Sequence, residues 1–335
     1  MQLKASKIQS SPLASLLLIA PFFLWGTAMV AMKGVIPNTT PLFMAGVRLF
    51  PAGFLVLAAA MLMGRPQPKG WKAWLWISLF ALIDGMLFQG FLAEGLVRID
   101  AGLGSVMIDS QPLAVALLSG LLFGEIIGLL GWLGLCIGIL GISLIGLPED
   151  LIISFLQGQE VFSDFTINWL QLFDNGEWLM LLAALAMALG TVMIRIISKY
   201  ADPIVATGWH MVLGGLPLFA LSGMWESQQW SHLEPTHWLA LAYSTIFGSA
   251  IAYGFFFHFA STGNLTSLSA LTFLTPVFAL LFGNLLLSER LTTLQWIGVC
   301  LTLVSIYLIN QREEIVQKWQ SLNRQPVGEQ NQALE

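Results

Sequence analysis

The chain carries one pattern of residues twice, at a constant separation along the sequence. Both copies are almost wholly apolar, so the duplicated unit belongs to a membrane bundle. In membrane proteins, an internal duplication is the usual architecture of a transporter whose site lies between the copies. Each repeated residue is followed 164 positions later by its counterpart: Trp74 by Trp238, Pro112 by Pro276, Glu125 by Glu289, Trp132 by Trp296 and Cys136 by Cys300.

The composition agrees with a helical membrane protein that crosses the bilayer many times. Apolar residues make up 56% of the 335 residues and charged residues only 10%, well below the roughly 25% charge of a soluble domain. The net charge of −5 disfavours binding to nucleic acid, which requires clustered Lys and Arg. We therefore expect a small-molecule substrate and membrane lipid as partners, with no nucleic acid, no metal and no cofactor. The chain is expected to act as a monomer or a homodimer.

Ten segments have the length and apolar character of a transmembrane helix, which needs about 20 such residues. The predicted fold is therefore all-α, with ten transmembrane helices. The first five spans are predicted at 13–34, 40–63, 72–94, 101–123 and 128–147. The second five are predicted at 178–199, 203–224, 237–260, 265–287 and 291–310.

These spans divide the chain into four parts. Residues 1–147 form the first five-helix repeat, and residues 148–177 form an acidic connector without Lys or Arg. Residues 178–310 form the second repeat, and residues 311–335 form a charged tail, which is expected to be disordered or a short surface helix. The connector is expected outside the cell and the tail in the cytoplasm.

Basic residues set the orientation, because cytoplasmic loops carry an excess of Lys and Arg. With a cytoplasmic N-terminus, ten basic residues lie inside and three outside, so both termini are predicted to be cytoplasmic. Each repeat has an odd number of spans, so the two must lie upside-down to one another, as a 5+5 inverted repeat. The outer three are Lys33, Arg98 and Arg290; the inner ten are Lys4, Lys7, Arg65, Lys69, Lys72, Arg195, Lys199, Arg312, Lys318 and Arg324.

Matching motifs in the two halves resemble a known family. Trp25-Gly26-Thr27 is echoed by Leu189-Gly190-Thr191, and the segment Pro41 to Arg48 is echoed by Pro203 to His210. Together with the repeated Pro, Glu and Trp positions, each half resembles the EamA domain of the drug/metabolite transporter superfamily, over roughly residues 13–310. The resemblance implies alternating-access movement of a small metabolite, often outward, with the substrate between spans one, three, four, six, eight and nine. It does not fix the substrate.

Three charged residues lie inside predicted spans, where a charge costs at least about 2.5–3.5 kcal/mol and therefore marks an interior or functional position. Counted from the outer helix ends, Arg48 and Asp109 lie roughly 12 Å deep and Asp84 roughly 15 Å deep. The second copy has no matching carboxylates: Asp84 corresponds to Gly248 and Asp109 to Phe273. Two hypotheses remain open. The cluster is a structural Arg–Asp ion pair, or one aspartate takes up a proton and couples it to export.

Polar residues inside the spans are the candidate substrate-binding groups. Gln89 and its counterpart Tyr253 can offer hydrogen bonds to a substrate or can equally form satisfied contacts between helices. Trp25 can line a cavity that accepts apolar parts of a solute or can equally pack against lipid. Pro112 and Pro276 are expected to interrupt their helices and to free the carbonyls of Ile108 and Thr272. Paired interruptions at matching positions indicate a midplane site. The predicted binding residues are thus Trp25, Gln89, Gln111, Tyr253 and Thr275. His210, the counterpart of Arg48, is expected to be a packing histidine with one hydrogen bond.

Span 128–147 carries four glycines on one helical face. Their spacings of three, four and three predict a groove of small residues that packs closely against another helix of the same chain. These glycines are Gly131, Gly134, Gly138 and Gly141.

The sequence favours a secondary transporter in the plasma membrane, the inner membrane of a Gram-negative cell, moving an amino-acid-like or amphipathic metabolite. A passive channel or a structural membrane protein remains an alternative. An intramembrane aspartyl protease would use two carboxylates that share a proton, but Asp84 and Asp109 lack a Gly-x-Gly-Asp context. No phosphate-loop motif is present, so transport driven directly by ATP is not expected, and the chain is not expected to be an enzyme.

Overall fold

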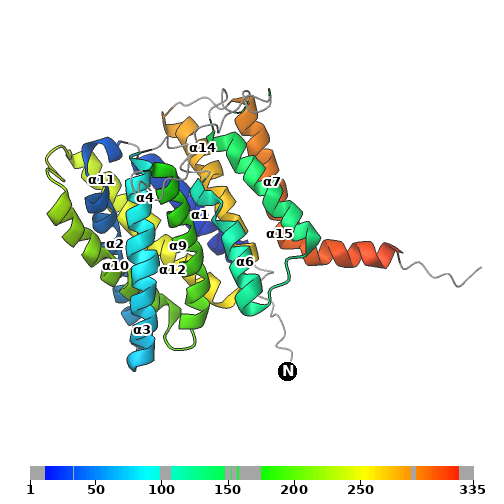
Figure 1. Cartoon of the computed structure of the whole chain (residues 1–335), viewed down its shortest axis with the longest axis horizontal. Helices are drawn as coiled ribbons and strands as arrows, with labels where there is room; N and C mark the ends of the chain where they lie inside the picture. Colours follow the sequence, from blue (N-terminus) through cyan, green and yellow to red (C-terminus); the bar gives the residue numbers. More distant parts are fainter. Residues whose placement is uncertain are drawn as a thin grey trace, which may run out of the picture.

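The computed structural model describes residues 12–32, 34–98, 107–147, 152, 157, 175–287 and 292–323. Over these residues the chain is a bundle of helices without strands (Figure 1). Eight helices are long and apolar enough to cross a membrane, and two shorter apolar helices occupy Leu16–Met32 and Met107–Phe123. The chain is therefore built as a multi-pass membrane protein.

In the described part of the first half there are six α-helices and two short segments of other helix types that matter below. A 3₁₀ turn, η2, covers Ile36–Asn38, and a π-helical segment, η3, covers Ala81–Phe88 between two α-helices. The α-helices are α1 (Pro12–Met32), α2 (Pro41–Leu62), α3 (Trp71–Phe80), α4 (Gln89–Leu96), α6 (Gln111–Phe123) and α7 (Gly128–Gly146). The predicted spans match these bounds within a few residues, apart from the fourth, whose described part begins at Met107.

The second half follows the same order. A second π-helical segment, η5 (Ser244–Ile251), and a 3₁₀ turn, η6 (Leu271–Phe273), interrupt its long helices. The α-helices are α9 (Gly176–Ile197), α10 (Pro203–Trp225), α11 (Pro235–Tyr243), α12 (Ala252–Thr262), α13 (Leu265–Ala270), α14 (Leu274–Leu287) and α15 (Thr293–Asn323). Helix α15 continues past residue 310, so the first part of the predicted tail is an extension of the last span. The connector, apart from residues 152, 157 and 175–177, lies outside the described residues.

Helices α2 and α10, which occupy matching places in the two copies, pack along each other in opposite directions. At one end, Glu226 follows α10 and accepts hydrogen bonds from the first amides of α2, at Leu42 (2.8 Å) and Phe43 (3.0 Å). At the other end, Arg65 follows α2 and pairs with Asp202, the N-cap of α10, at 3.3 Å. Each carboxylate thus satisfies amides at a helix N-terminus and fixes the ends of the pair.

Four glycines let the backbones of α2 and α10 approach closely, and their contacts are mirrored. A Cβ on Gly53 would lie 2.7 Å from Val212, and one on Gly215 would lie 2.9 Å from Phe50. A Cβ on Gly46 would lie 3.1 Å from Phe219, and one on Gly208 would lie 2.7 Å from Leu57. A shift of 162 positions relates residues of α2 to those of α10. Exchanging the helices by this shift turns the Gly53–Val212 contact into the Gly215–Phe50 contact, and the Gly46–Phe219 contact into the Gly208–Leu57 contact. Glycine is used here because only its missing side chain allows this approach.

The glycine face of α7 packs against α15, as predicted, in the pair at the right of the bundle in Figure 1. Ser305 donates to the carbonyl of Gly134 at 2.6 Å, and a Cβ on Gly141 would lie 2.6 Å from the Thr302 hydroxyl. Further along, Gln295 donates to Ile145 at 3.4 Å. Residue numbers rise on one helix as they fall on the other, so this second matching pair is antiparallel too.

A partly buried carboxylate joins the two halves at the turn between α6 and α7. Glu125 pairs with Arg195 at 2.8 Å and accepts hydrogen bonds from the amides of Leu265 (3.1 Å) and Thr266 (3.3 Å). Burial raises the pKa of Glu125, but these hydrogen bonds and the arginine outweigh it, so the pKa lies below its ordinary value. The stability that this contact contributes is present above the unfolded pKa and is lost as the pH falls through the lower folded one.

Candidate functional site

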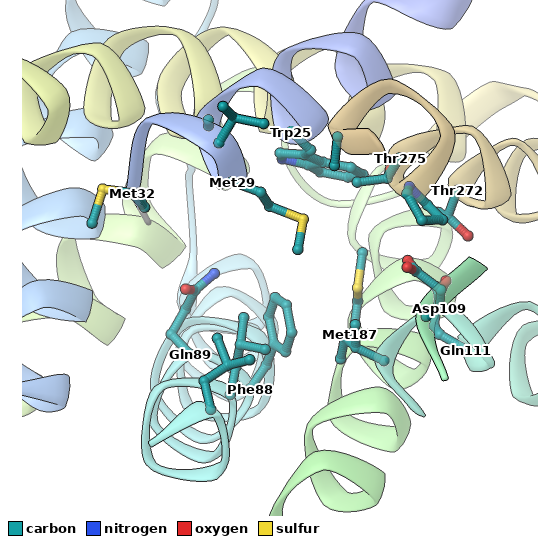
Figure 2. Close-up of a pocket in the computed structure, with 18 of the residues that line it drawn as sticks. Trp25, Met29, Met32, Phe88, Gln89, Asp109, Gln111, Met187, Thr272 and Thr275 are labelled. Carbon is teal, nitrogen blue, oxygen red and sulfur yellow. The ribbon is translucent and has the colours of Figure 1, made fainter. Parts of the chain in front are cut away.

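A cavity of about 330 Å³ lies in the middle of the bundle and is lined by helices from both halves. Most of its wall is apolar, with aromatic and methionine side chains from α1, η3 and α9. Figure 2 shows the side chains of Met29 and Met187 reaching into the space between Trp25 and Phe88. A volume and lining of this kind are typical of a site for a small organic molecule.

The predicted binding residues all lie on this cavity. The residues that line it include Trp25, Gln89, Gln111, Tyr253 and Thr275. Figure 2 labels all of these except Tyr253. Whether they bind a substrate stays a prediction. The Gln89 amide donates to the Tyr253 hydroxyl at 2.8 Å, in a buried bond between two residues that occupy matching places in the copies. Equivalent residues of a two-fold arrangement meet only at its axis, so this bond marks where the halves face each other.

Four residues that line the cavity each have a buried polar atom without a hydrogen-bond partner in the described part of the chain. These atoms are the Trp25 indole Nε1, the Gln111 Oε1, the Thr275 hydroxyl and the Arg48 Nε. The other end of the Gln111 amide donates to Thr191 at 3.2 Å. Buried polar groups in proteins nearly always have a partner, so these four residues keep hydrogen-bonding capacity that no described residue uses.

The two repeated prolines lie where their helices are interrupted, as predicted, while the freeing of the Ile108 and Thr272 carbonyls stays a prediction. Pro112 stands in the first turn of α6, and the chain before it ends in a turn in which the Ser110 amide donates to the Met107 carbonyl. Pro276 likewise follows the 3₁₀ turn η6 and lies in the first turn of α14. At this place the missing N–H of proline costs nothing. The helix breaks themselves reach the cavity, because Ile108 and Thr272 line it.

The carboxylate of Asp84 pairs with His210, so Asp84 is not the aspartate of the Arg–Asp ion pair that one of the two hypotheses considered. Asp84 Oδ2 lies 3.1 Å from His210 Nε2, and both side chains are fully buried, at 1% and 0% exposure. The imidazole also stacks on Phe80, with ring centroids 4.0 Å apart. The counterpart relation of His210 to Arg48 was seen in the sequence, but it was not used to place both residues beside the third span of the other copy.

The hydrogen bonds of His210 fix the charge of this pair. Its Nδ1 lies 2.5 Å from the carbonyl of Thr207, which only accepts, so Nδ1 carries a hydrogen. The contact between Nε2 and Asp84 then holds one further proton, on the histidine or on the carboxyl. Both arrangements are neutral overall. The prediction that His210 is a packing histidine with one hydrogen bond is therefore incomplete, since it has two partners.

The three charged residues expected in one cluster are separated by the fold. Arg48 and Asp109 line the cavity, whereas Asp84 lies behind it against α9 and α10. Arg48 forms no hydrogen bond or ion pair within the described part of the chain, and its Nε is buried without a partner. Asp109 does have an interaction partner. The surroundings of Asp84 and Asp109 are thus distinct, whereas an aspartyl-protease dyad requires two carboxyls that share a proton.

A central cavity between apolar helices of two related halves is the arrangement of a membrane transporter. Comparison with known families agrees: the model of the EamA-like transporter family matches twice, at residues 12–147 and 174–311. The chain belongs to this family.

Relatives of the chain are also named as transporters. An uncharacterized transporter of Synechocystis sp. is 60% identical over 96% of this chain and 98% of its own length. A chloroplastic WAT1-related protein of Arabidopsis thaliana is 53% identical over 88% of this chain and 68% of its own. The uncharacterized inner membrane transporter YedA of Escherichia coli is 25% identical over 87% of this chain and 89% of its own.

A solved crystal structure shares the fold. It aligns with a TM-score of 0.71 at 18% identity, covering 89% of this chain and 96% of that one.

Proposed function

We propose that the chain is a secondary transporter with ten spans in a 5+5 inverted repeat, which carries a small amphipathic metabolite through its central cavity by alternating access. The supporting observation is the cavity itself: both halves line it, and four of its lining residues have a buried polar atom without a described partner. The family supplies the class of activity. Export, and cytoplasmic termini in a plasma or inner membrane, follow from the charge bias of the loops and the resemblance of the motifs.

The inverted repeat is supported by the packing of matching helices. The pairs α2 with α10 and α7 with α15 are antiparallel, as equivalent helices must be when one copy is turned over in the membrane. The Gly53 and Gly215 contacts are images of each other under exchange of the copies. The π-helical segments η3 and η5 fall at matching positions as well. Such symmetry lets one fold open to either side with the same set of contacts.

The π-helical segments are suited to bend during this cycle. π-helical turns inside α-helices are frequent at functional sites, because their hydrogen bonding is less regular. Segment η3 ends at Phe88 on the cavity wall. Its backbone touches α10 where Gly85 meets Gly214. Movement of η3 against α10 would therefore change the shape of the cavity directly.

Counterflow in proteoliposomes tests the transport proposal. Vesicles loaded with an unlabelled solute should take up the labelled solute faster than empty vesicles, because a carrier returns faster when loaded. A passive channel gives no such stimulation. Thr275→Phe, which fills the cavity, should abolish uptake. Leu285→Phe, on the same helix but 72% exposed, should leave it unchanged. Equal uptake with and without internal solute would contradict the proposal.

Proton coupling is a separate part of the proposal and is assigned to Asp84 with Asp109 as the alternative. The Asp84–His210 contact holds one proton in the bundle interior, and such groups in transporters often serve as relays. Asp84→Asn should abolish pH-driven uptake into inverted vesicles while leaving exchange of solute intact. The same measurement on Asp109→Asn separates the two candidates. Full pH-driven uptake in both variants would refute the coupling.

A further inference from the structure

We infer that the cavity recognises the acid group of a small organic anion, and that Arg48 is the residue that binds it. This inference rests on the proposed function, because it takes the central cavity as the substrate site. It follows from a place where the two copies of the repeat differ.

The difference appears when each residue is exchanged with its counterpart. Asp84 on η3 pairs with His210 on α10. Their counterparts are Gly248 on η5 and Arg48 on α2. Segment η5 packs along α2, where the Thr245 hydroxyl lies 3.4 Å from the carbonyl of Val47. At the second pair of positions a glycine, Gly248, replaces the carboxylate, and a Cβ there would lie 2.6 Å from Ala28 of α1. Arg48 has lost the partner that the symmetry would give it.

The guanidinium is left on the cavity wall. Arg48 is only partly buried and lines the cavity, and no described side chain bonds to it. The Asp84–His210 pair is neutral as a unit. Asp109, the other charged side chain among the described residues of the wall, already has an interaction partner. A cation held in an apolar bundle without a counter-charge is expensive, and it normally faces a site where an anion binds.

The rest of the wall describes the body of the ligand. Around Arg48 the lining is apolar and aromatic, including Met44, Phe88 and Leu92. A carboxylate fits the planar fork of a guanidinium with two parallel hydrogen bonds. The Gln111 and Thr275 side chains supply further hydrogen-bonding atoms without charge. The fitting solute is therefore a small organic acid with one acid group and an apolar body.

Matched compounds with one carbon skeleton test the charge preference. Purified full-length protein in detergent is melted with benzoate, benzamide or benzylamine, and again with hexanoate, hexanamide or hexylamine. A ligand that binds only the folded state raises the melting temperature. Both acids at saturating concentration should raise it by at least about 3 °C. The amides and amines should not. Equal shifts with amides or amines, or no shift with either acid, would overturn the inference.

Variants of Arg48 test the residue. Arg48→Gln should weaken acid binding at least about tenfold, because hydrogen bonds to charged groups are the strong ones, and Arg48→Lys should retain part of it. Arg65→Gln, an arginine that follows the same helix but is 38% exposed, is the matched control and should bind acids normally. Acid binding that is unchanged in Arg48→Gln would overturn the assignment.

The ligand-free protein gives a second and independent measurement. If Arg48 is an unpaired charge kept for an anion, Arg48→Met should melt at the same temperature as the parent or higher. If Arg48 is instead a structural ion-pair partner, the variant should melt several degrees lower, and the inference fails. Failure of this inference can be distinguished from failure of the proposed function. If a neutral or cationic solute shows counterflow, and Arg48→Gln does not change that counterflow, the protein is a transporter but the anion site is rejected.

Discussion

Two equivalent contacts between helices, η3 with α10 and η5 with α2, treat a polar side chain inside the bundle differently. Where η3 meets α10, Asp84 and His210 neutralise each other in a dry contact at 3.1 Å. Where η5 packs along α2, the position equivalent to Asp84 is Gly248, whose Cβ direction meets Ala28 of α1, and Arg48 lines the cavity. The first contact pairs its two polar side chains, whereas in the second no described side chain bonds to the arginine. Under the inference above, the loss of one partner of a symmetric pair leaves a charge for a ligand.

The largest effect is expected from restoring the missing carboxylate. Gly248→Asp puts an acid at the position equivalent to Asp84, and Ala28→Gly makes room for it, since a Cβ at 248 would lie 2.6 Å from Ala28. The new ion pair should occupy the guanidinium and abolish the thermal shift caused by benzoate and hexanoate. Ala28→Gly alone is the control and should keep that shift. Persistent acid binding in the double variant would break the comparison.

The second-largest effect is expected from removing the existing Asp84–His210 pair. This change should lower the stability of the folded protein. Asp84→Ala leaves the buried His210 Nε2 without a partner, and the loss of one member of a buried polar pair costs about 3 kcal/mol. The quantity to measure is the free energy of unfolding in a denaturing-detergent titration. His210→Ala should cost a similar amount, and the double variant should cost less than the two singles added together. Additive costs would show that the two side chains do not interact.

The space beside Asp84 gives a smaller effect. A Cβ on Gly190 would lie 2.3 Å from Asp84 Oδ1, so Gly190→Ala should push the carboxylate away from His210. Overpacking of this kind costs about 1–3 kcal/mol. Gly254, with nothing within 4 Å of a Cβ, is the matched control in a helix, and Gly254→Ala should be neutral or slightly stabilising. A melting temperature that is unchanged in Gly190→Ala would contradict the geometry described here.

The smallest expected effect is the difference in stability between two variants at equivalent positions, Gly53→Ala and Gly215→Ala. Gly53 and Gly215 occupy image positions between α2 and α10, and each faces backbone atoms of the other helix. Gly53→Ala and Gly215→Ala should both destabilise, with costs within about 1 kcal/mol of each other, since overpacking a tight contact costs about 1–3 kcal/mol. Melting curves of the two variants in the same detergent measure this. Unequal losses would show that the copies differ here too.

The sequence predicted the helices well and the contacts between them poorly. Apolar runs separated by polar turns gave most span bounds within a few residues, because the length of a membrane helix follows from the thickness of the bilayer. The glycine face of α7 was also found, because its spacing is a property of one helix. Similar depth in the membrane wrongly suggested that Asp84 and Arg48 belong to one cluster. Depth gives the level of a residue along its helix, but it does not say which neighbouring helix the side chain faces.

The π-helical segments were also absent from the sequence reading. Ala81–Phe88 and Ser244–Ile251 have the same apolar composition as the α-helices around them, and no residue in them forces a wider turn. In the first segment, the close approach of Gly85 to Gly214 accompanies the altered helix.

What the chain alone determined was a duplicated set of apolar helices, together with the residues that later proved to line one cavity. That information is local, since it depends on spacing within a helix and on exact repetition between the halves. The tertiary structure decided which polar groups have partners. Asp84 meets His210 rather than Arg48, because helix rotation and the glycines at 85, 190 and 214 set which faces touch. Pairing across helices depends on three-dimensional packing, so no single segment encodes it.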